Sequence, residues 1–471
     1  MNKTKIHACI CAGLSAALFA VLAGMMRGLE HCTGWGDALA LALLFTLPAA
    51  VATAFYAVKE RPSAGRLLFA GTLLGVMMAA RATMLDFTTA DYGSFLHPWT
   101  EVFREGGFAM LAQNVGDYNL VYQYFLLLVS KTPLHDLYLI KLLSVVFDYA
   151  LAMVMMRAAD HYAGKDAAVT ALLLVPALPT VLLDGACWGQ CDTVYVFFIV
   201  LALYLLETKR PMRSAAALAI AFAFKLQTIF FFPVVLLGLI HKRYKLRDAA
   251  VFFAAYLATM LPALLAGRPF MDALSVYANQ SVGQYYDRLS YNAPTLYNLF
   301  PMMEFGSTRP FAWARYVKDA QVLENNEYLV GALMPALQNA ALYACVALAL
   351  MAVIYWLMHW REVTTDMTLN FALFCAIFLP FIMPKMHERY FFLADMLSVL
   401  YAFRRKDRRF MPLLVVGASF VSYMAYLMRN RPVEDYVLSL VMLGALAVAG
   451  YDLLQGMRAQ RSKLAEGSVK A

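Results

Sequence analysis

Long apolar runs alternate with short polar segments from one end of the chain to the other. Stretches such as 251–266 and 337–357 approach or reach the roughly 20 apolar residues that a helix needs to cross a hydrocarbon core. A membrane β-barrel would instead show short segments with alternating apolar and polar positions, which the sequence lacks. The pattern therefore predicts an all-α, multi-pass membrane protein with roughly 12 spans. The predicted spans are 6–26, 38–57, 66–85, 137–157, 166–183, 192–207, 248–267, 330–357, 367–384, 390–403, 410–428 and 433–455.

The segment 211–241 does not fit a single span, because basic clusters flank it on both sides. If both clusters are cytoplasmic, the chain must enter the membrane and return. Two half-length helices with a turn near Lys225–Gln227 satisfy this condition, provided that protein or water covers the exposed backbone. The alternative is one tilted span with a single basic loop on the outside.

The spans leave two sizeable polar loops, 86–136 and 268–329, and a polar tail, 459–471. In the first loop, apolar residues recur at helical spacing, which predicts helices lying in the membrane interface. The second loop is rich in Tyr, Asn and Gln and has no predicted span. The tail is predicted to be a disordered cytoplasmic segment. The remaining residues, 1–458, are interpreted as one transmembrane domain.

Composition agrees with a membrane protein and sets an orientation. Of the 471 residues, 62% are hydrophobic and 15% are charged, whereas a soluble domain carries about 25% charge. The net charge of +8 comes from basic clusters between the spans, which mark cytoplasmic loops rather than a nucleic-acid surface. With these loops inside, both large loops and the polar segments 184–192 and 384–390 fall on the outer face, where we expect the functional site.

The first outer loop carries three carboxylates of interest. Asp86 and Asp91 follow directly after a predicted span, beside aromatic residues. They could act as a general base or hold a divalent cation, although a solvated loop start is the plainer interpretation. Asp117 lies in a Gly-Asp-Tyr-Asn sequence, which favours a turn or the N-cap of the next helix.

A second motif, Asp184-Gly-Ala-Cys-Trp-Gly-Gln-Cys-Asp192, joins two predicted spans. Trp188 offers an aromatic surface, and Gln190 and Asp192 offer polar groups beside it, as in many carbohydrate sites. Asp192 could equally cap the following helix. Cys187 and Cys191 could bind a metal, but no further Cys or His pair completes such a site.

Lys225 and Gln227 lie between strongly apolar flanks. A cation buried in a membrane is costly and therefore suggests a function, such as binding a phosphate. The alternative is an ion pair with a buried carboxylate, for example Asp148. Lys141 competes for the same partner, because it lies about two turns away on the same helix face.

The densest polar cluster is Pro384-Lys-Met-His-Glu-Arg-Tyr390, between two predicted spans on the outer side. Lys385, His387 and Arg389 can all donate hydrogen bonds to phosphate oxygens, and Glu388 can orient one of them. The alternative is an aromatic and basic anchor at the membrane interface.

The ordered set of motifs resembles a known family. The order is a D-Y-x-x-F-L-x-P-W loop, then W-G-Q-C-D, then F-K-L-Q, then M-H-E-R-Y-F, from about Ala82 to Leu400. Each motif is weak alone, but together they resemble bacterial relatives of the GPI-anchor and N-glycan mannosyltransferases, which are GT-C glycosyltransferases. One departure is Asp184, where the family would have an amide such as Asn.

The resemblance implies a GT-C-like fold and the transfer of one hexose, with mannose favoured, from a polyprenyl-phosphate sugar to an acceptor hydroxyl with inversion. The partners would be that donor, a glycan, lipid or protein acceptor, and membrane lipid. The setting would be the outer face of a bacterial cytoplasmic membrane. It assigns Asp91, with Asp86 second, as the catalytic carboxylate. It assigns Lys225, His387, Arg389 and Lys385 to the donor phosphate. Sugar and acceptor contacts would come from Trp188, Gln190, Asp192, Gln227, Glu388, Tyr390 and Asp117.

Metal use stays open, because the two Asp residues could hold one divalent cation or cationic side chains could replace it. No Gly-rich nucleotide-binding loop is present, which agrees with a lipid donor. Two other functions remain at this level: a flippase or transporter of lipid-linked saccharide, and a ligase or polymerase that uses a diphosphate donor. The absence of an internal repeat counts against a transporter.

Overall fold

The computed structural model describes residues 3–278, 289–299 and 320–469. Its chain divides into two compact units, one formed by residues 1–228 and 246–280 and the other by residues 229–245 and 281–471. Each unit is helical, and the only β-type pairing among the described residues is an isolated bridge between Ser290 and Met386. Whether the two units act as one domain, as the sequence predicts, stays a prediction.

The multi-pass α-helical class is confirmed. In the described part of the chain, eight helices are long and apolar enough to cross a membrane, or nine if a bent pair counts as one span. The eight are α1 (Lys3–Arg27), α2 (Trp35–Glu60), α3 (Ala64–Ala82), α6 (Asp136–Ala163), α16 (Ala320–Met358), α17 (Thr368–Ile382), α19 (Met411–Leu427) and α20 (Asp435–Val469).

The other predicted spans are shorter or broken. The bent pair runs from α7 (Lys165–Leu174) through α8 (Pro179–Leu182) to η4 (Leu183–Trp188), with a 47° bend near two prolines. Proline removes a backbone donor and clashes with the preceding turn, so a break is expected there. The remaining candidates are α9 (Asp192–Glu207), α12 (Leu246–Ala258) with α13 (Leu261–Leu265), and α18 (Phe392–Arg404).

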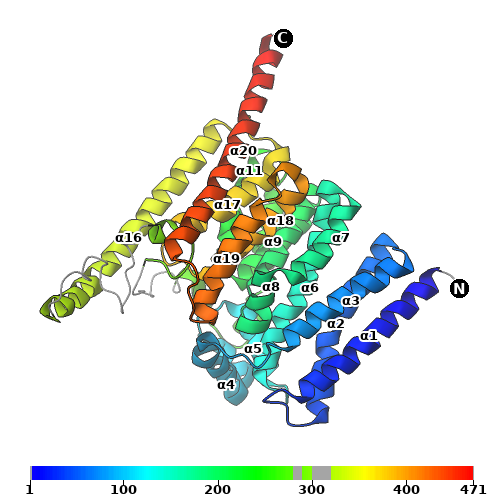
Figure 1. Cartoon of the computed structure of the whole chain (residues 1–471). Coiled ribbons are helices and arrows are strands. Elements are labelled where there is room, and N and C mark those ends of the chain that lie inside the picture. Colours follow the sequence, from blue (N-terminus) through cyan, green and yellow to red (C-terminus); the bar gives the residue numbers. More distant parts are fainter. Residues whose placement is uncertain (1–2, 279–288, 300–319, 470–471) are drawn as a thin grey trace. The chain divides into compact units, whose positions relative to one another are not determined.

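Helix α6 is at the centre of the first unit, where it packs against α2, α7 and α9. More than half of its most apolar stretch is buried, whereas α1 buries little. Helices α1, α2 and α3 pack against one another and form the dark blue group in Figure 1. Helix α1 is therefore mostly exposed, whereas α6 carries the packing that supports the candidate site.

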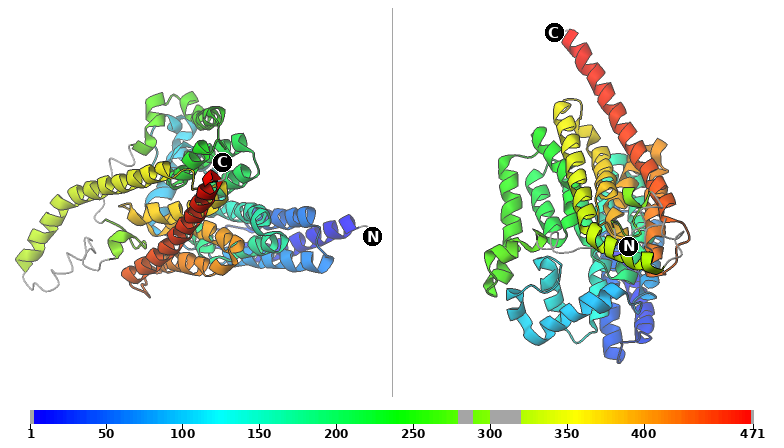
Figure 2. Two further views of the ribbon diagram at one scale, coloured as in Figure 1. Left: turned by 90° about the horizontal axis from the view of Figure 1, so that it is seen from above. Right: turned by 90° about the vertical axis from the view of Figure 1, so that its left-hand side faces the viewer.

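The loop 86–136, which the sequence predicts on the outer face, is built from short helices, as predicted. They are η1 (Tyr92–Leu96), α4 (His97–Gly106), η2 (Gly107–Ala112) and α5 (Leu120–Ser130). Figure 2 shows α4 and α5 across the ends of the long helices of this unit rather than alongside them. Asn119 caps α5, since its side chain accepts a hydrogen bond from the Leu120 amide. The cap of this helix is therefore Asn119, and Asp117, the residue that the sequence favoured for a turn or cap, is exposed.

The predicted break at Lys225 is present. Helix α10 (Pro211–Phe224) ends there, Lys225 has an extended backbone, and a 3₁₀ segment η5 (Leu226–Phe231) leads to α11 (Phe232–Ile240). The boundary between the units falls at Thr228, within η5. Whether the two short helices enter and leave on the same side stays a prediction.

In the second unit, α17, α18, α19 and α20 pack together. The segment 289–299, with η6 (Leu296–Asn298), contacts α17 and α20. Helix α20 continues through residue 469 and extends beyond its neighbours as the red helix in Figure 1. The disorder predicted for the tail is therefore wrong for residues 459–469, where helical geometry continues and Arg461 pairs with Glu362 at 2.9 Å.

Candidate active site in the first unit

Asp91 is the centre of a hydrogen-bonded group that joins distant parts of the sequence. Its Oδ2 accepts a bond from Nε1 of Trp188 at 2.9 Å and from Nε2 of Gln190 at 2.8 Å. The donors are 97 and 99 residues further along the chain. Asp91 stands immediately before η1, whereas both donors belong to the motif after α8. Two donors on one oxygen hold the carboxylate in a single orientation.

The backbone around Gln190 explains how its side chain reaches Asp91. Gly189 has a φ of +77°, a left-handed conformation that favours glycine. The Gln190 amide then donates to the Asp184 carbonyl at 2.9 Å, and the hydroxyl of Ser144, on α6, donates to the Gln190 carbonyl. The main chain of the motif is thereby fixed against α6, while the Gln190 side chain reaches Asp91.

Tyr118 extends this group toward Lys225. The Tyr118 hydroxyl donates to Oε1 of Gln190 at 2.8 Å. The Lys225 ammonium lies 6.0 Å from the centre of the Tyr118 ring and 5.9 Å from that of Tyr195. Tyr118 also packs on Trp99 and Tyr122. Sequence reasoning selected Asp117 and missed its neighbour, because no spacing rule marks a tyrosine that bridges two motifs.

Lys225 forms a buried ion pair with Asp192. Their atoms Nζ and Oδ2 are 2.7 Å apart, and the side chains are 7% and 0% exposed. The alternative of an ion pair with a buried carboxylate is thus correct in kind, but the suggested partner Asp148 is wrong. Asp148 pairs instead with Arg81 at 2.9 Å and accepts a bond from Thr193.

Lys141 is also not a partner of Asp148. Its ammonium donates to the backbone carbonyls of Met84, Leu85 and Phe87, at 2.6 to 2.9 Å. These carbonyls lie beyond the end of α3, in the turn that begins the loop 86–136. The buried Lys141 ammonium donates to them in place of the amides that a continuing helix would supply. Lys141 therefore fixes the start of the loop.

Asp86 has a different environment from Asp91. It accepts a bond from the Tyr138 hydroxyl at 2.7 Å and from the Glu30 amide at 3.2 Å. These contacts tie the loop after α1 to the start of α6. Asp86 therefore has hydrogen-bond partners different from those of Asp91.

Gln227 carries an unsatisfied group. Its Oε1 is buried and has no hydrogen-bond partner among the residues that the structure describes. An unpaired buried carbonyl is costly, so a ligand donor at this position would be stabilising. Gln227 follows Lys225 by two residues in the broken segment, next to the Lys225–Asp192 pair.

The Lys385–Tyr390 motif belongs to the second unit and is held by the segment 289–292. Tyr291 and Met386 share a backbone bond of 2.9 Å, and the Tyr291 ring stacks on His387 with centres 4.1 Å apart. Glu388 is 1% exposed and accepts from the Asn292 side chain at 2.7 Å.

The three cations of this motif are half-buried. Lys385 has a left-handed backbone, with a φ of +63°, and partial burial lowers the pKa of its ammonium. The guanidinium of Arg389 lies 5.7 Å from the centre of the Tyr390 ring. Asn292, which supports Glu388, accepts a bond from Arg431. The sequence indicated the four polar residues but not their support from the second outer loop.

A search of curated proteins gives no match to this chain. The family description "Glycosyltransferase family 87" matches residues 120–384, which is more than half of the 471 residues. The matched range begins at α5 and includes Trp188, Gln190, Asp192, Lys225 and Gln227. A hydrogen-bonded carboxylate and amide next to a buried cation, on a scaffold of membrane-length helices, is chemically suited to sugar transfer. The chain belongs to glycosyltransferase family 87 and is a membrane glycosyltransferase.

Proposed function

We propose that this protein transfers one hexose, mannose in preference, from a polyprenyl-phosphate sugar to an acceptor hydroxyl at the outer face of the membrane. The observation that carries the proposal is the group of Asp91, Trp188, Gln190 and Tyr118, which ends at Lys225. It combines a fixed carboxylate, a cation and hydrogen-bonding groups, which are the parts that sugar transfer needs. The lipid donor is proposed from the resemblance in the motifs, because a membrane enzyme has direct access to such a donor.

In the proposed reaction Asp91 is the general base. The acceptor oxygen attacks the anomeric carbon of the donor sugar, and Asp91 takes the proton of that hydroxyl. The bond from the anomeric carbon to the phosphate oxygen breaks, and its electron pair leaves with the phosphate. Attack from the opposite face inverts the anomeric centre.

The negative charge on the leaving phosphate increases as this bond breaks, so cations placed in advance lower the barrier. We assign this role to Lys225 and to Lys385, His387 and Arg389. Arg389 can bind two phosphate oxygens at once, which a lysine cannot do. Gln227, with its buried unsatisfied carbonyl oxygen, and Gln190 are assigned to sugar hydroxyls.

The first test is a donor screen with the purified full-length protein in lipid nanodiscs. Polyprenyl-monophosphate, polyprenyl-diphosphate and nucleotide sugars are supplied side by side, with mass detection of the product. We expect transfer from the monophosphate donor alone. Transfer from the diphosphate donor would instead favour the ligase or polymerase function, and transfer from a nucleotide sugar would reject a lipid donor.

The second test is Asp91→Asn, which keeps the shape of the side chain and removes its basicity. We expect transfer to fall about 10²–10⁴-fold, which is the usual contribution of a general base. The measurement is the initial rate at saturating donor, with the unfolding temperature recorded for each variant. Glu105→Gln is the matched control, because Glu105 is an exposed carboxylate of α4 in the same loop. An Asp91→Asn enzyme with full activity would remove Asp91 as the base.

A further inference from the structure

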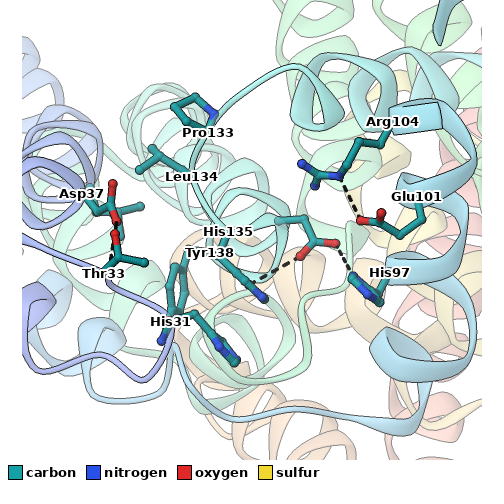
Figure 3. A pocket seen from close by; sticks show the side chains of 12 residues that line it. His31, Thr33, Asp37, His97, Glu101, Arg104, Pro133, Leu134, His135 and Tyr138 are labelled. Atoms are coloured by element: carbon teal, nitrogen blue, oxygen red, sulfur yellow. Dashed lines mark hydrogen bonds and ion pairs between the residues drawn. The ribbon is translucent and has the colours of Figure 1, made fainter. Parts of the chain in front are cut away.

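A polar pocket of about 530 Å³ opens in the first unit, beside the Asp91 group. Figure 3 shows that its lining comes from the loop after α1, from the start of α2, from α4, and from the loop before α6 and the start of that helix. Tyr92, the residue after Asp91, lies between the two sites, and its hydroxyl donates to Asp136 at 2.8 Å. The pocket is lined by His31, His97, Glu101, Arg104, His135 and Asp136, among others.

Three metal-ligating side chains meet in this pocket. One ligand atom from each of His97, Glu101 and Asp136 lies within 4.8 Å of the other two. No other group of three His, Cys, Asp or Glu residues in the described ranges meets this condition, and neither Asp86 nor Asp91 belongs to it. His97 and Glu101 are four residues apart on α4, so they share one helix face, and Asp136 begins α6.

These side chains already contact one another and Arg104. Nδ1 of His97 and Oδ2 of Asp136 are 2.7 Å apart, and Asp136 is 2% exposed. Glu101 accepts from Nε of Arg104 at 2.9 Å. In a tetrahedral zinc site, ligands at about 2.0–2.2 Å from the ion are separated by roughly 3.3 Å. Small side-chain movements would therefore admit an ion between His97 and the two carboxylates.

The chemistry of the ligands selects the class of ion. Calcium and magnesium prefer oxygen ligands alone. One imidazole with two carboxylates suits first-row divalent ions such as zinc. The imidazole of His97 and the carboxylate of Glu101 are 44% and 39% exposed, so the ion would have open positions toward the pocket.

We propose that His97, Glu101 and Asp136 form a binding site for a first-row divalent transition-metal ion of the zinc class. The ion joins α4 to the first residue of α6. Asp136 also accepts a hydrogen bond from the Tyr92 hydroxyl. Through Asp136 and Tyr92, the same ion fixes the loop that carries Asp91. The inference does not depend on the donor or on the reaction proposed above, because it concerns binding alone.

The test uses the untagged full-length protein in detergent, stripped with a chelator and titrated with Co²⁺. Cobalt is a spectroscopic substitute for zinc, so binding is followed by visible absorption and by elemental analysis after dialysis. We expect one Co²⁺ per chain. His97→Asn and Glu101→Gln should each abolish binding, because removing a direct ligand costs more than the roughly 10–100-fold that follows loss of a residue that only orients a ligand. Arg104→Gln should strengthen it, because it removes a competing cation from Glu101.

Glu105→Gln, on the same helix, is the matched control and should bind as the unmodified protein does. Each metal-free variant is also tested for an unchanged unfolding temperature. Glu101→Gln keeps the test decisive if His97→Asn fails to fold, because Glu101 is part of the exposed side of the cluster. The proposal is overturned if the protein binds no Co²⁺, or if binding survives both substitutions. It is equally overturned if His31→Asn or His135→Asn removes the ion while His97→Asn does not.

Discussion

Asp86 and Asp91 are carboxylates five residues apart in one loop, and the fold gives them different partners. Asp86 accepts a hydrogen bond from the Tyr138 hydroxyl, which connects its loop to α6, and one from the Glu30 amide, which connects it to the loop after α1. Asp91 accepts from an indole and a side-chain amide of the motif after α8. The first set of contacts is typical of a structural carboxylate. The second places Asp91 among groups that can also bind a sugar.

Substitutions in the Lys225–Asp192 pair should affect stability and activity differently. Lys225→Met leaves a buried carboxylate without this cation and should cost about 3–5 kcal/mol in the free energy of unfolding. Adding Asp192→Leu should recover most of that loss, since an apolar pair of similar size is often neutral. Transfer should stay low in both variants, because the proposed phosphate contact is absent. Thermal unfolding and initial rates are measured on the same preparations. Recovery of activity in the double variant would show that the pair is only structural.

At the scale of elements, the polar groups of the candidate site lie where regular helices are interrupted. Lys225 is extended between α10 and η5, and Gly189 is left-handed after η4. Asp91 precedes a π-helical turn, η1, a type of turn that is often found at functional sites. In a continuous helix, successive side chains point in different directions around the axis. A break changes the direction of the backbone, so that neighbouring side chains can point toward the same place.

Gly116 provides a test of the first outer loop. Its φ is +74°, and a Cβ there would lie 2.3 Å from Cε2 of Trp99. Gly116→Ala should cost about 1–2 kcal/mol from the positive φ alone, and the overlap with the indole adds to this cost. We expect a lower unfolding temperature and faster proteolysis between α4 and α5. Gly93→Ala is the control, since nothing lies within 4 Å of a Cβ at that position. Equal behaviour of the two variants would contradict the packing described for Trp99.

The raised pKa of Tyr297 leads us to expect that the protein loses stability at high pH. Burial raises the pKa of Tyr297 to about 12, and the nearby Cys345 adds to the effect. Its hydroxyl donates to the Ile382 carbonyl at 2.8 Å. An unfolded tyrosine ionises near pH 10. Between about pH 10 and 12 the unfolded chain therefore loses a proton that the folded chain keeps, and the free energy of unfolding falls as the pH rises.

The measurement is the slope of the unfolding free energy against pH over that range. Tyr297→Phe should show a shallower decline than the unmodified protein. Tyr436→Phe is the control and should leave the slope unchanged, because the Tyr436 side chain is 39% exposed at the first turn of α20. Identical slopes in all three proteins would show that Tyr297 does not contribute.

At the scale of the whole molecule, the long apolar helices determine the membrane class, with eight or nine of them in the ranges that the structure describes, and basic loops predict the orientation. The short helices α4 and α5 lie across the ends of the first unit's long helices (Figure 2). With basic loops inside, these short helices and Asp91 are predicted on the outer face. The orientation determines which substrates can reach the site.

Cysteine labelling tests that orientation in intact cells. Glu105→Cys on α4 should react with a membrane-impermeant maleimide applied from outside, whereas Asp166→Cys on α7 should react only after permeabilisation. Both residues are exposed. The background replaces Cys9, an exposed cysteine, with serine. The reverse labelling pattern would place the proposed site on the cytoplasmic side and reject the outer-face reaction.

The sequence by itself determined the helical membrane class, the break at Lys225, the motifs that carry polar groups and, in the described residues, eight or nine of the twelve predicted spans. Hydrophobic length and charge are local properties, so a chain read in order reveals them. The tertiary structure decided which polar groups meet. It paired Lys225 with Asp192 rather than Asp148, separated Asp86 from Asp91, and brought in Tyr118 and the His97–Asp136 cluster. These contacts join residues far apart in the chain, and hydrogen bonds and ion pairs depend on distances that no spacing rule encodes.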